Sequence, residues 1–212
     1  MSRIVVIEHL TLDGVMQAPG RPDEDTRGGF QHGGWAIPNN DEVMGRVLGA
    51  GMSQGGSLLF GRRTYEGFHG FWPHQKDNPF TDVLNSVQKY VASTTLTEPL
   101  PWSNSTLLKG DLAEAVAGLR EQPGQDIGVL GSGELVRWLM RHDLIDEYLL
   151  LIHPLVLGSG CRLFPDGVVA TLRLVDSVTT TTGVVIARYQ PAGAAEPVGS
   201  PQGADAVGAG PA

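Results

Sequence analysis

The chain has 212 residues, a formal net charge of −8 and 41% hydrophobic residues, a composition typical of a single globular domain. The acidic balance argues against a nucleic-acid partner, because duplex binding requires a basic surface. The single cysteine, Cys161, excludes an intramolecular disulfide and a cysteine metal cluster, and we interpret it as a small buried residue. No apolar run approaches the ~20 residues of a membrane span and no signal-peptide pattern is present, so we expect a cytoplasmic protein without a membrane partner.

In its first half, the chain alternates strand and helix patterns around one long polar loop. Such a loop in a compact domain is usually functional or disordered. The elements predicted there are a strand at 4–7, the loop at 10–34, a helix from Asp41 to about Met52, a strand at 57–60, a turn into a short helix at 61–65, and a loop at 67–79.

The second half continues the alternation and then ends in two adjacent strands. The predicted elements are a helical turn at 81–86, strands at 89–93 and 105–108, a helix at 111–120, a strand at 127–130, a helix at 134–141, a strand at 148–152 and a hairpin of strands at 172–178 and 184–189. This order predicts an α/β fold whose sheet is mostly parallel, with an antiparallel C-terminal edge. Residues 191–212 contain 16 Ala, Gly or Pro among 22, which predicts a disordered tail after a domain at 1–190.

Two strand-to-helix junctions carry residue types that bind phosphate. At the first, two arginines and a hydroxyl follow a glycine, which suits a dianionic phosphate. At the second, a Gly-Ser-Gly turn opens a helix whose N–H groups and positive dipole end favour an anion. A solvated arginine pair and a tight turn are the alternatives, and the turn lacks the third glycine of GxGxxG. The residues are Gly61, Arg62, Arg63 and Thr64, and then Gly131, Ser132 and Gly133.

Ser93 and Thr94 end a third predicted strand, where hydroxyl groups either complete a phosphate site or cap a turn. Ligands of α/β sheets collect in the crevice at the carboxyl ends of the strands, and all three junctions lie at such ends. Together they indicate a phosphate-bearing ligand more strongly than any one of them does.

Candidates for catalysis lie near the start of the chain. Glu8 and His9 are adjacent at the end of the first strand, and strand alternation sends one toward each face of the sheet. Trp35 is either a core anchor or a ligand-facing ring. Asp41 is either a catalytic acid or, as the local sequence favours, a helix N-cap. The six histidines form no metal-binding pattern, so we expect no metal site.

Several segments of the chain match one known family. They are VLGSGEL at 129–135, DLIDE at 143–147, HPLVLGSG at 153–160, LF at 163–164, LLFGRRTY at 58–65, KYVAS at 89–93 and TLDG at 11–14. With these segments, residues 3–189 resemble the dihydrofolate-reductase-like superfamily, and within it the C-terminal reductase domain of bifunctional riboflavin-biosynthesis enzymes and its stand-alone bacterial relatives. The resemblance implies a three-layer fold around a mostly parallel sheet.

The same resemblance implies NADPH as the hydride donor. It places the 61–64 junction beside the cofactor phosphates, Ser93 and Thr94 near the adenosine 2′-phosphate, and the 131–133 turn with Glu134 under the pyrophosphate. The arginines favour NADPH over NADH, because only NADPH carries the 2′-phosphate. Residues 35–38 are similar to the Trp-x-Leu-Pro segment of the dihydrofolate reductase mobile loop. The pterin-binding carboxylate that follows in those enzymes falls on Asn40, with Asp41 one residue later.

The sequence therefore predicts an NADPH-dependent reductase that transfers a hydride to a small heterocycle, pterin- or pyrimidine-like, or to a conjugated carbonyl. The substrate would stack near Trp35, with Asp41, Glu8 or a water molecule orienting or protonating it. The departure at the acid position favours an alternative, a non-catalytic NADPH- or nucleotide-binding module on the same fold.

We also expect a homodimer. Residues 148–152 and 155–157 form an apolar stretch broken only by His153 and Pro154, and Pro154 suits a sheet edge or bulge. An apolar edge favours pairing with a second copy of the chain. The alternative is that the C-terminal hairpin covers this stretch within one chain.

Overall fold

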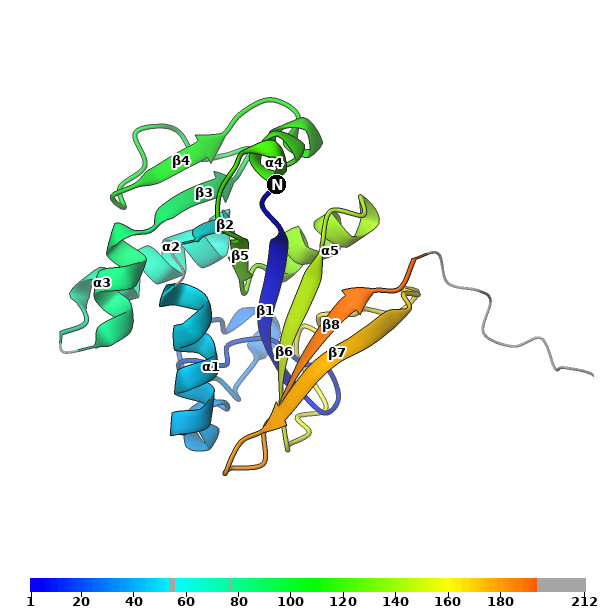
Figure 1. The fold of residues 1–212 in the computed structure, drawn as a ribbon. Coiled ribbons are helices and arrows are strands. Elements are labelled where there is room, and N and C mark those ends of the chain that lie inside the picture. The colour runs from blue at the N-terminus through cyan, green and yellow to red at the C-terminus, as the bar shows by residue number, and fades with distance from the viewer. Residues whose placement is uncertain (54–55, 77, 194–212) are drawn as a thin grey trace, which may run out of the picture.

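Residues 1–53, 56–76 and 78–193 are described by a computed structural model, in which helices pack on both faces of one twisted sheet (Figure 1). The strands are β1 (Ile4–Thr11), β2 (Ser57–Gly61), β3 (Gln88–Ala92), β4 (Ser105–Leu108), β5 (Ile127–Leu130), β6 (Glu147–His153), β7 (Leu172–Thr179) and β8 (Val185–Pro191). The α-helices are α1 (Glu42–Ser53), α2 (Arg62–Phe71), α3 (Pro79–Ser86), α4 (Leu112–Glu121) and α5 (Gly133–Arg141). Short 3-10 helices are η1 (Arg27–Gly29), η2 (Ile37–Asn39) and η3 (Trp72–His74).

The sheet has the strand order β4-β3-β2-β5-β1-β6-β8-β7. The first six strands in this order are parallel, and β8 pairs antiparallel with both β6 and β7. The predicted α/β fold with an antiparallel C-terminal edge is therefore confirmed. Strands β2, β3 and β4 are added outward from β1, and β5 then returns to the place between β1 and β2, so the strand order reverses there. In α/β sheets, ligands bind at the carboxyl ends of the strands beside such a reversal.

Alternation along the strands builds the three layers. In β2, Leu58 and Phe60 pack into a cluster with side chains of α2 and α3, whereas Leu59 packs into the cluster under α4 and α5. Side chains of α1 cover Leu149 and Leu151 of β6 on the first of these faces. Each face of the central strands is apolar, as expected for a parallel sheet covered by helices on both sides.

Two expectations about individual segments were wrong. The aromatic stretch at 67–79 was expected to be a loop, but α2 continues to Phe71 and η3 follows directly. Its aromatic rings supply the apolar face of α2, with Phe68 packed beside Phe60, and this tertiary packing outweighs the helix-breaking glycines. The apolar stretch at 148–152 is also no sheet edge, because β6 pairs with β1 and β8.

The described structure continues past residue 190, where the domain was predicted to end. Pro191 belongs to β8, and the Ala192 N–H donates to the Thr171 carbonyl oxygen at 3.0 Å. The remainder of the predicted tail, 194–212, lies outside the described residues. Within the part of the chain that is described, no helix is long and apolar enough to cross a bilayer.

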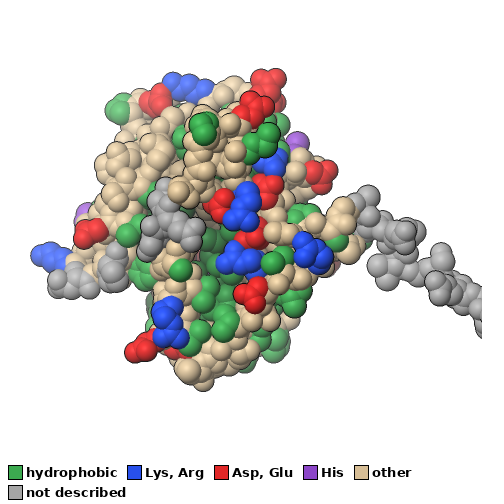
Figure 2. All heavy atoms as spheres, viewed as in Figure 1, with side chains coloured by type: hydrophobic (Ala, Val, Ile, Leu, Met, Phe, Trp, Pro, Cys, Tyr) green, Lys and Arg blue, Asp and Glu red, His purple; other side chains and the backbone are tan. Residues whose placement is uncertain are grey.

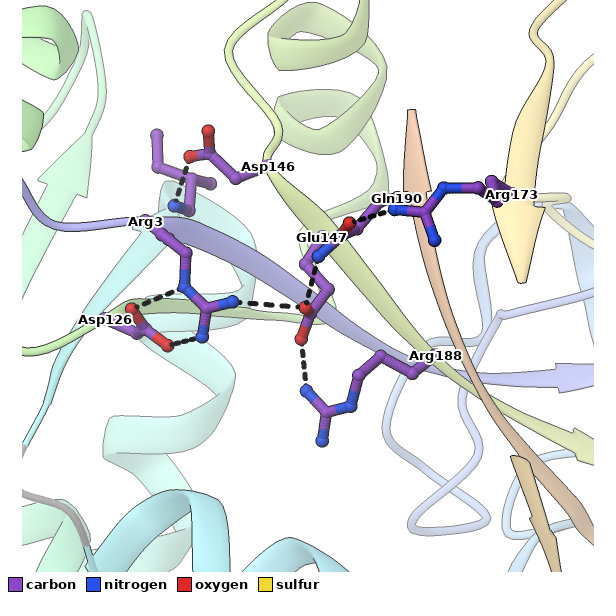
Figure 3. Close-up of polar contacts among 8 residues, drawn as sticks. Arg3, Asp126, Asp146, Glu147, Arg173, Arg188 and Gln190 are labelled. Carbon is purple, nitrogen blue, oxygen red and sulfur yellow. Dashed lines mark hydrogen bonds and ion pairs between the residues drawn. The ribbon is translucent and has the colours of Figure 1, made fainter. Parts of the chain in front are cut away.

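A polar network joins the strands at the end of the sheet opposite the crevice (Figure 3). The carboxylate of Glu147, only 2% exposed, accepts hydrogen bonds from Arg3 (3.2 Å), from Gln190 (3.3 Å) and from Arg188. These contacts connect β1, β6 and β8. Beside them, hydrophobic side chains are visible between α1 and the β7–β8 hairpin (Figure 2), where Val47 and Ile186 line a hollow.

Candidate functional site

The two predicted phosphate junctions meet at the carboxyl ends of β2 and β5. The Gly61 N–H donates to Ser132 Oγ at 3.1 Å, and the Ser132 N–H donates to Thr64 Oγ1 at 3.0 Å. The start of α2 and the turn before α5 are thus bonded to each other in both directions. The structure brings Gly61, Thr64 and Ser132 into one cluster at the point where the strand order reverses.

The backbone of the turn requires its glycine. Gly131 has φ +57°, and a Cβ there would lie 3.2 Å from Thr64 Cγ2. Ser132 is also left-handed, with φ 62°, and α5 begins at Gly133. Loop residue Met16 lies against that helix start, because a Cβ on Gly133 would meet Met16 Sδ at 2.6 Å. Backbone N–H groups at the start of a helix are the elements of an anion-binding turn.

Charged side chains surround this cluster. Arg63 of α2 pairs with Glu134 of α5 at 3.0 Å, and Arg62 pairs with Glu66 one turn along α2 at 2.8 Å. The side chains of Arg62 and Arg63 are 38% and 52% exposed, so these ion pairs contribute little to folding stability. Both guanidinium groups therefore lie at the surface beside the joined turns.

Ser93 and Thr94 lie on the adjacent strand. Gly61 pairs with Ala92 in the β2–β3 register, so Ser93 follows at the level of Arg62. The Ser93 hydroxyl accepts hydrogen bonds from Thr95 N–H (3.1 Å) and Leu96 N–H (3.0 Å), which is the turn-capping alternative. No hydrogen bond within the described ranges joins Ser93 or Thr94 to the other two junctions.

Glu8 is enclosed on the face of β1 that α5 covers. It alternates with Val6 and Leu10 of the α4–α5 cluster, is 3% exposed, and its Oε1 has no hydrogen-bond partner among the described residues. Burial raises the pKa of Glu8 well above its usual value; nearby Glu24 adds to the rise and Arg137 opposes it. The Glu8 carboxyl group therefore holds its proton above the pH at which a surface glutamate ionises.

Trp35 anchors the long first loop. Its indole N–H donates to the Gln17 carbonyl oxygen at 2.7 Å, and its ring packs with Val15 and Phe30. The ring also meets His153 at a centroid distance of 5.1 Å and an interplanar angle of 87°. Trp35 therefore fits the core-anchor alternative, because its side chain is only 8% exposed.

Asp41 is the N-cap of α1, as the local sequence predicted. Its Oδ1 accepts from Met44 N–H at 2.9 Å, and its Oδ2 accepts from the backbone (2.7 Å) and hydroxyl (2.6 Å) of Thr181. The carboxylate thus joins α1 to the turn of the β7–β8 hairpin. These bonds lower the pKa of Asp41, with the Met44 contact contributing most. The catalytic assignment of Asp41 stays a prediction.

A pair of histidines was missed. His9 Nδ1 and His153 Nε2 lie 2.9 Å apart, at the carboxyl ends of β1 and β6. Sequence separation concealed the pair, although the parallel register of these strands, Thr11 opposite His153, places it there. Adjacent polar residues at the ends of neighbouring parallel strands were the available signal.

Cys161 corrects another expectation. It is exposed rather than buried, and its N–H donates to Gln17 Oε1 at 2.9 Å. Across the described parts of the chain, no group of three or more His, Cys, Asp or Glu side chains has an arrangement that could hold a metal ion.

The strand order, the helices on both faces and the joined turns at the carboxyl ends define the dihydrofolate-reductase-like class of folds. The chain belongs to the RibD C-terminal domain family, whose model matches residues 3–186. It is 31% identical over 190 residues to the protein YyaP of Bacillus subtilis, covering 86% of this chain and 92% of that one.

Solved structures share the fold. A putative riboflavin biosynthesis protein from Shewanella sp. PV-4 superposes with a TM-score of 0.67 and 24% identity, over 89% of this chain and 98% of that one. Dihydrofolate reductase from Enterococcus faecalis, complexed with NADP(H), gives a TM-score of 0.57 and 14% identity, over 90% and 96% of the two chains.

Proposed function

We propose that this protein is an NADPH-dependent reductase that transfers a hydride to a small heterocyclic substrate, pterin- or pyrimidine-like, or to a conjugated carbonyl. The observation that carries the proposal is the mutual bonding of the two turns at Gly61 and Ser132, with two surface arginines beside them. Membership of the RibD C-terminal domain family and the fold shared with an NADP(H)-bound dihydrofolate reductase support it.

The chemistry of the joined turns fits a dinucleotide phosphate. Gly131 to Glu134 would lie under the pyrophosphate, where glycine permits close approach and α5 directs its N–H groups. Arg62, Arg63 and Thr64 would contact the cofactor phosphates, with Ser93 and Thr94 toward the adenosine 2′-phosphate. NADPH, when bound, supplies the hydride.

The protein's own contribution would be position and a proton. Glu8 has an enclosed carboxyl group whose pKa is raised by burial, a property that favours general acid catalysis, and we propose that it supplies the proton. Trp35 would form part of the wall of the substrate pocket, and Asp41 would hold the first turn of α1 in place beside it.

The test is the loss of NADPH absorbance when the purified protein is mixed with pterins, pyrimidines, quinones and conjugated ketones. We expect turnover with at least one class, and a Glu8→Gln variant with lower kcat and unchanged NADPH affinity. NADPH binding with no turnover across the panel would contradict the reductase.

That second result would instead support a non-catalytic NADPH- or nucleotide-binding module. One observation favours this alternative: both carboxylate oxygens of Asp41 are engaged in capping α1 and holding Thr181. Asp41, the acid nearest to the predicted pterin-binding position, thus has a structural role in this fold.

We further propose that the protein forms a homodimer through β7. Among the described residues this strand is the antiparallel edge of the sheet, and its residues Leu174, Val175 and Val178 are 51%, 43% and 38% exposed. Apolar side chains on an unpaired edge favour pairing with another strand.

A further inference from the structure

We propose that His9 and His153 form a hydrogen-bonded pair that presents the Nε2–H of His9 to the substrate as a fixed donor for an uncharged acceptor, a carbonyl oxygen or a ring nitrogen. This inference rests on the proposed reductase function, and it assigns to the same site the polar group that its substrate must carry.

The histidine pair lies at the carboxyl ends of β1 and β6, beside the joined turns. Ile7 is opposite Leu130 in the β1–β5 register, so His9, two residues further, reaches the level of Ser132. His9 alternates with Ile7, which packs on the α1 face of the sheet. The imidazole therefore lies between the joined turns and the layer that α1 forms.

The interior end of the pair is closed. His153 is fully buried, its Nε2 faces His9 and its ring packs against Trp35. Its Nδ1 has no hydrogen-bond partner among the described residues. A buried N–H without an acceptor is rarer in proteins than a buried acceptor without a donor. The proton of His153 is therefore best placed on Nε2, where it donates to His9.

The hydrogen bond from His153 determines which ring nitrogen of His9 carries the proton. If His9 Nδ1 accepts from His153, a neutral His9 carries its proton on Nε2. His9 is partly exposed, and its Nε2 is not among the buried atoms that lack partners, so this N–H is open to the crevice. His153 acts through His9 and is thus a positioning residue.

The pair is uncharged at neutral pH. Burial lowers the pKa of His9 to about 3, with repulsion from His153 adding to it, and burial lowers the pKa of His153 to about 4. A neutral donor at a site where burial disfavours charge favours a neutral acceptor, because burying an unpaired anion there is costly. The substrate would therefore present a lactam or ketone oxygen, or a ring nitrogen, at this point.

The first experiment is ¹⁵N NMR of the histidine-labelled protein. We expect both His9 and His153 as Nε2–H tautomers at neutral pH. A proton on His153 Nδ1 would reverse the direction of the hydrogen bond and overturn the proposal. This measurement needs no cofactor and so stands apart from the reductase function.

The second experiment titrates pterin, which carries a neutral lactam, into the protein in the presence of NADP⁺. Pterin should shift the His9 Nε2 resonance. His9→Phe should weaken pterin binding roughly tenfold, the value of one good hydrogen bond, and His9→Gln, which keeps an N–H donor, should recover part of it. NADP⁺ affinity should stay within about twofold in both variants.

The outcomes separate the two proposals. If pterin leaves the His9 resonance unchanged, or binds His9→Phe as tightly as the unmodified protein, the donor role of His9 is overturned. If NADP⁺ does not bind the unmodified protein, the proposed cofactor site is contradicted instead. The tautomer measurement then still decides the direction of the hydrogen bond between His153 and His9.

Discussion

Glu8 is a carboxyl group enclosed among apolar side chains on the face of β1 that α5 covers, and its chemistry follows from that enclosure. Its pKa is raised by burial and by Glu24. The sequence indicated that one of Glu8 and His9 would face each side of the sheet. The contact between His9 and His153 was not predicted, because it depends on the register of two strands far apart in the chain.

Replacing Glu8 by Gln should change how folding stability depends on pH. Because the folded-state pKa is raised, the folded protein keeps a proton that the unfolded chain releases above its ordinary pKa of 4.5. Stability is therefore greatest below that pH and falls as the pH rises toward the folded pKa. Glu8→Gln removes this fall, so it should melt at least ~2 °C higher than the unmodified protein at about pH 8, with little difference at about pH 4.

Thermal unfolding followed by circular dichroism over this pH range is the measurement. Glu114 on α4, whose side chain is exposed, supplies the control, since Glu114→Gln makes the same chemical change at the surface. A Glu8→Gln profile that parallels the unmodified protein at every pH would contradict the buried, protonated state.

At the level of elements, helix caps connect local sequence to tertiary structure. Asp111 and Asp41 both precede helices, and both accept hydrogen bonds from N–H groups in the first turn of those helices. Asp111 accepts from Ala113 and Glu114 N–H groups and serves α4 alone. Asp41 in addition joins α1 to Thr181, a contact across 140 residues that no local pattern reveals.

Asp41→Ala should therefore be more destabilising than Asp111→Ala. Both variants lose a helix cap, and only the Asp41 variant also loses the two bonds from Thr181, so its loss of unfolding free energy should be roughly twice as large. Urea denaturation of the two variants side by side measures the difference. Equal losses of unfolding free energy would show that the link to the hairpin contributes nothing.

The packing of the elements explains where their prediction from the sequence succeeded and where it failed. Hydrophobic patterns located the central strands, because the apolar faces of those strands are buried by helices on both sides. The hydrophobic patterns failed beyond Gly67. There Phe68 and Trp72 pack against the cluster that contains Phe60, and this packing stabilises helical structure that the glycines disfavour. The candidate cofactor residues were located by motif and resemblance, but their mutual bonding required the sheet order.

At the scale of the whole molecule, β7 rather than β6 is an edge of the sheet among the described residues, and it carries exposed apolar side chains. We expect sedimentation equilibrium at micromolar concentrations to give a dimer of the 22.6 kDa chain. Val175→Lys should weaken the dimer, because a charge on an edge strand opposes pairing. Val169→Lys, on a loop residue that is 82% exposed, is the matched control. A single monomeric species throughout would refute the dimer.

We propose that the joined turns at the carboxyl ends of β2 and β5 bind NADPH. Isothermal titration calorimetry measures this binding, with NADPH and NADH added to the unmodified protein and to the Arg62→Ala and Arg63→Ala variants. We predict tighter binding of NADPH. In at least one of the two variants, the preference should fall roughly ten- to a hundredfold, as expected for a lost charge-assisted phosphate contact of about 1.5–3 kcal/mol. Equal affinity of the unmodified protein for the two cofactors, or no binding of either, would contradict the account.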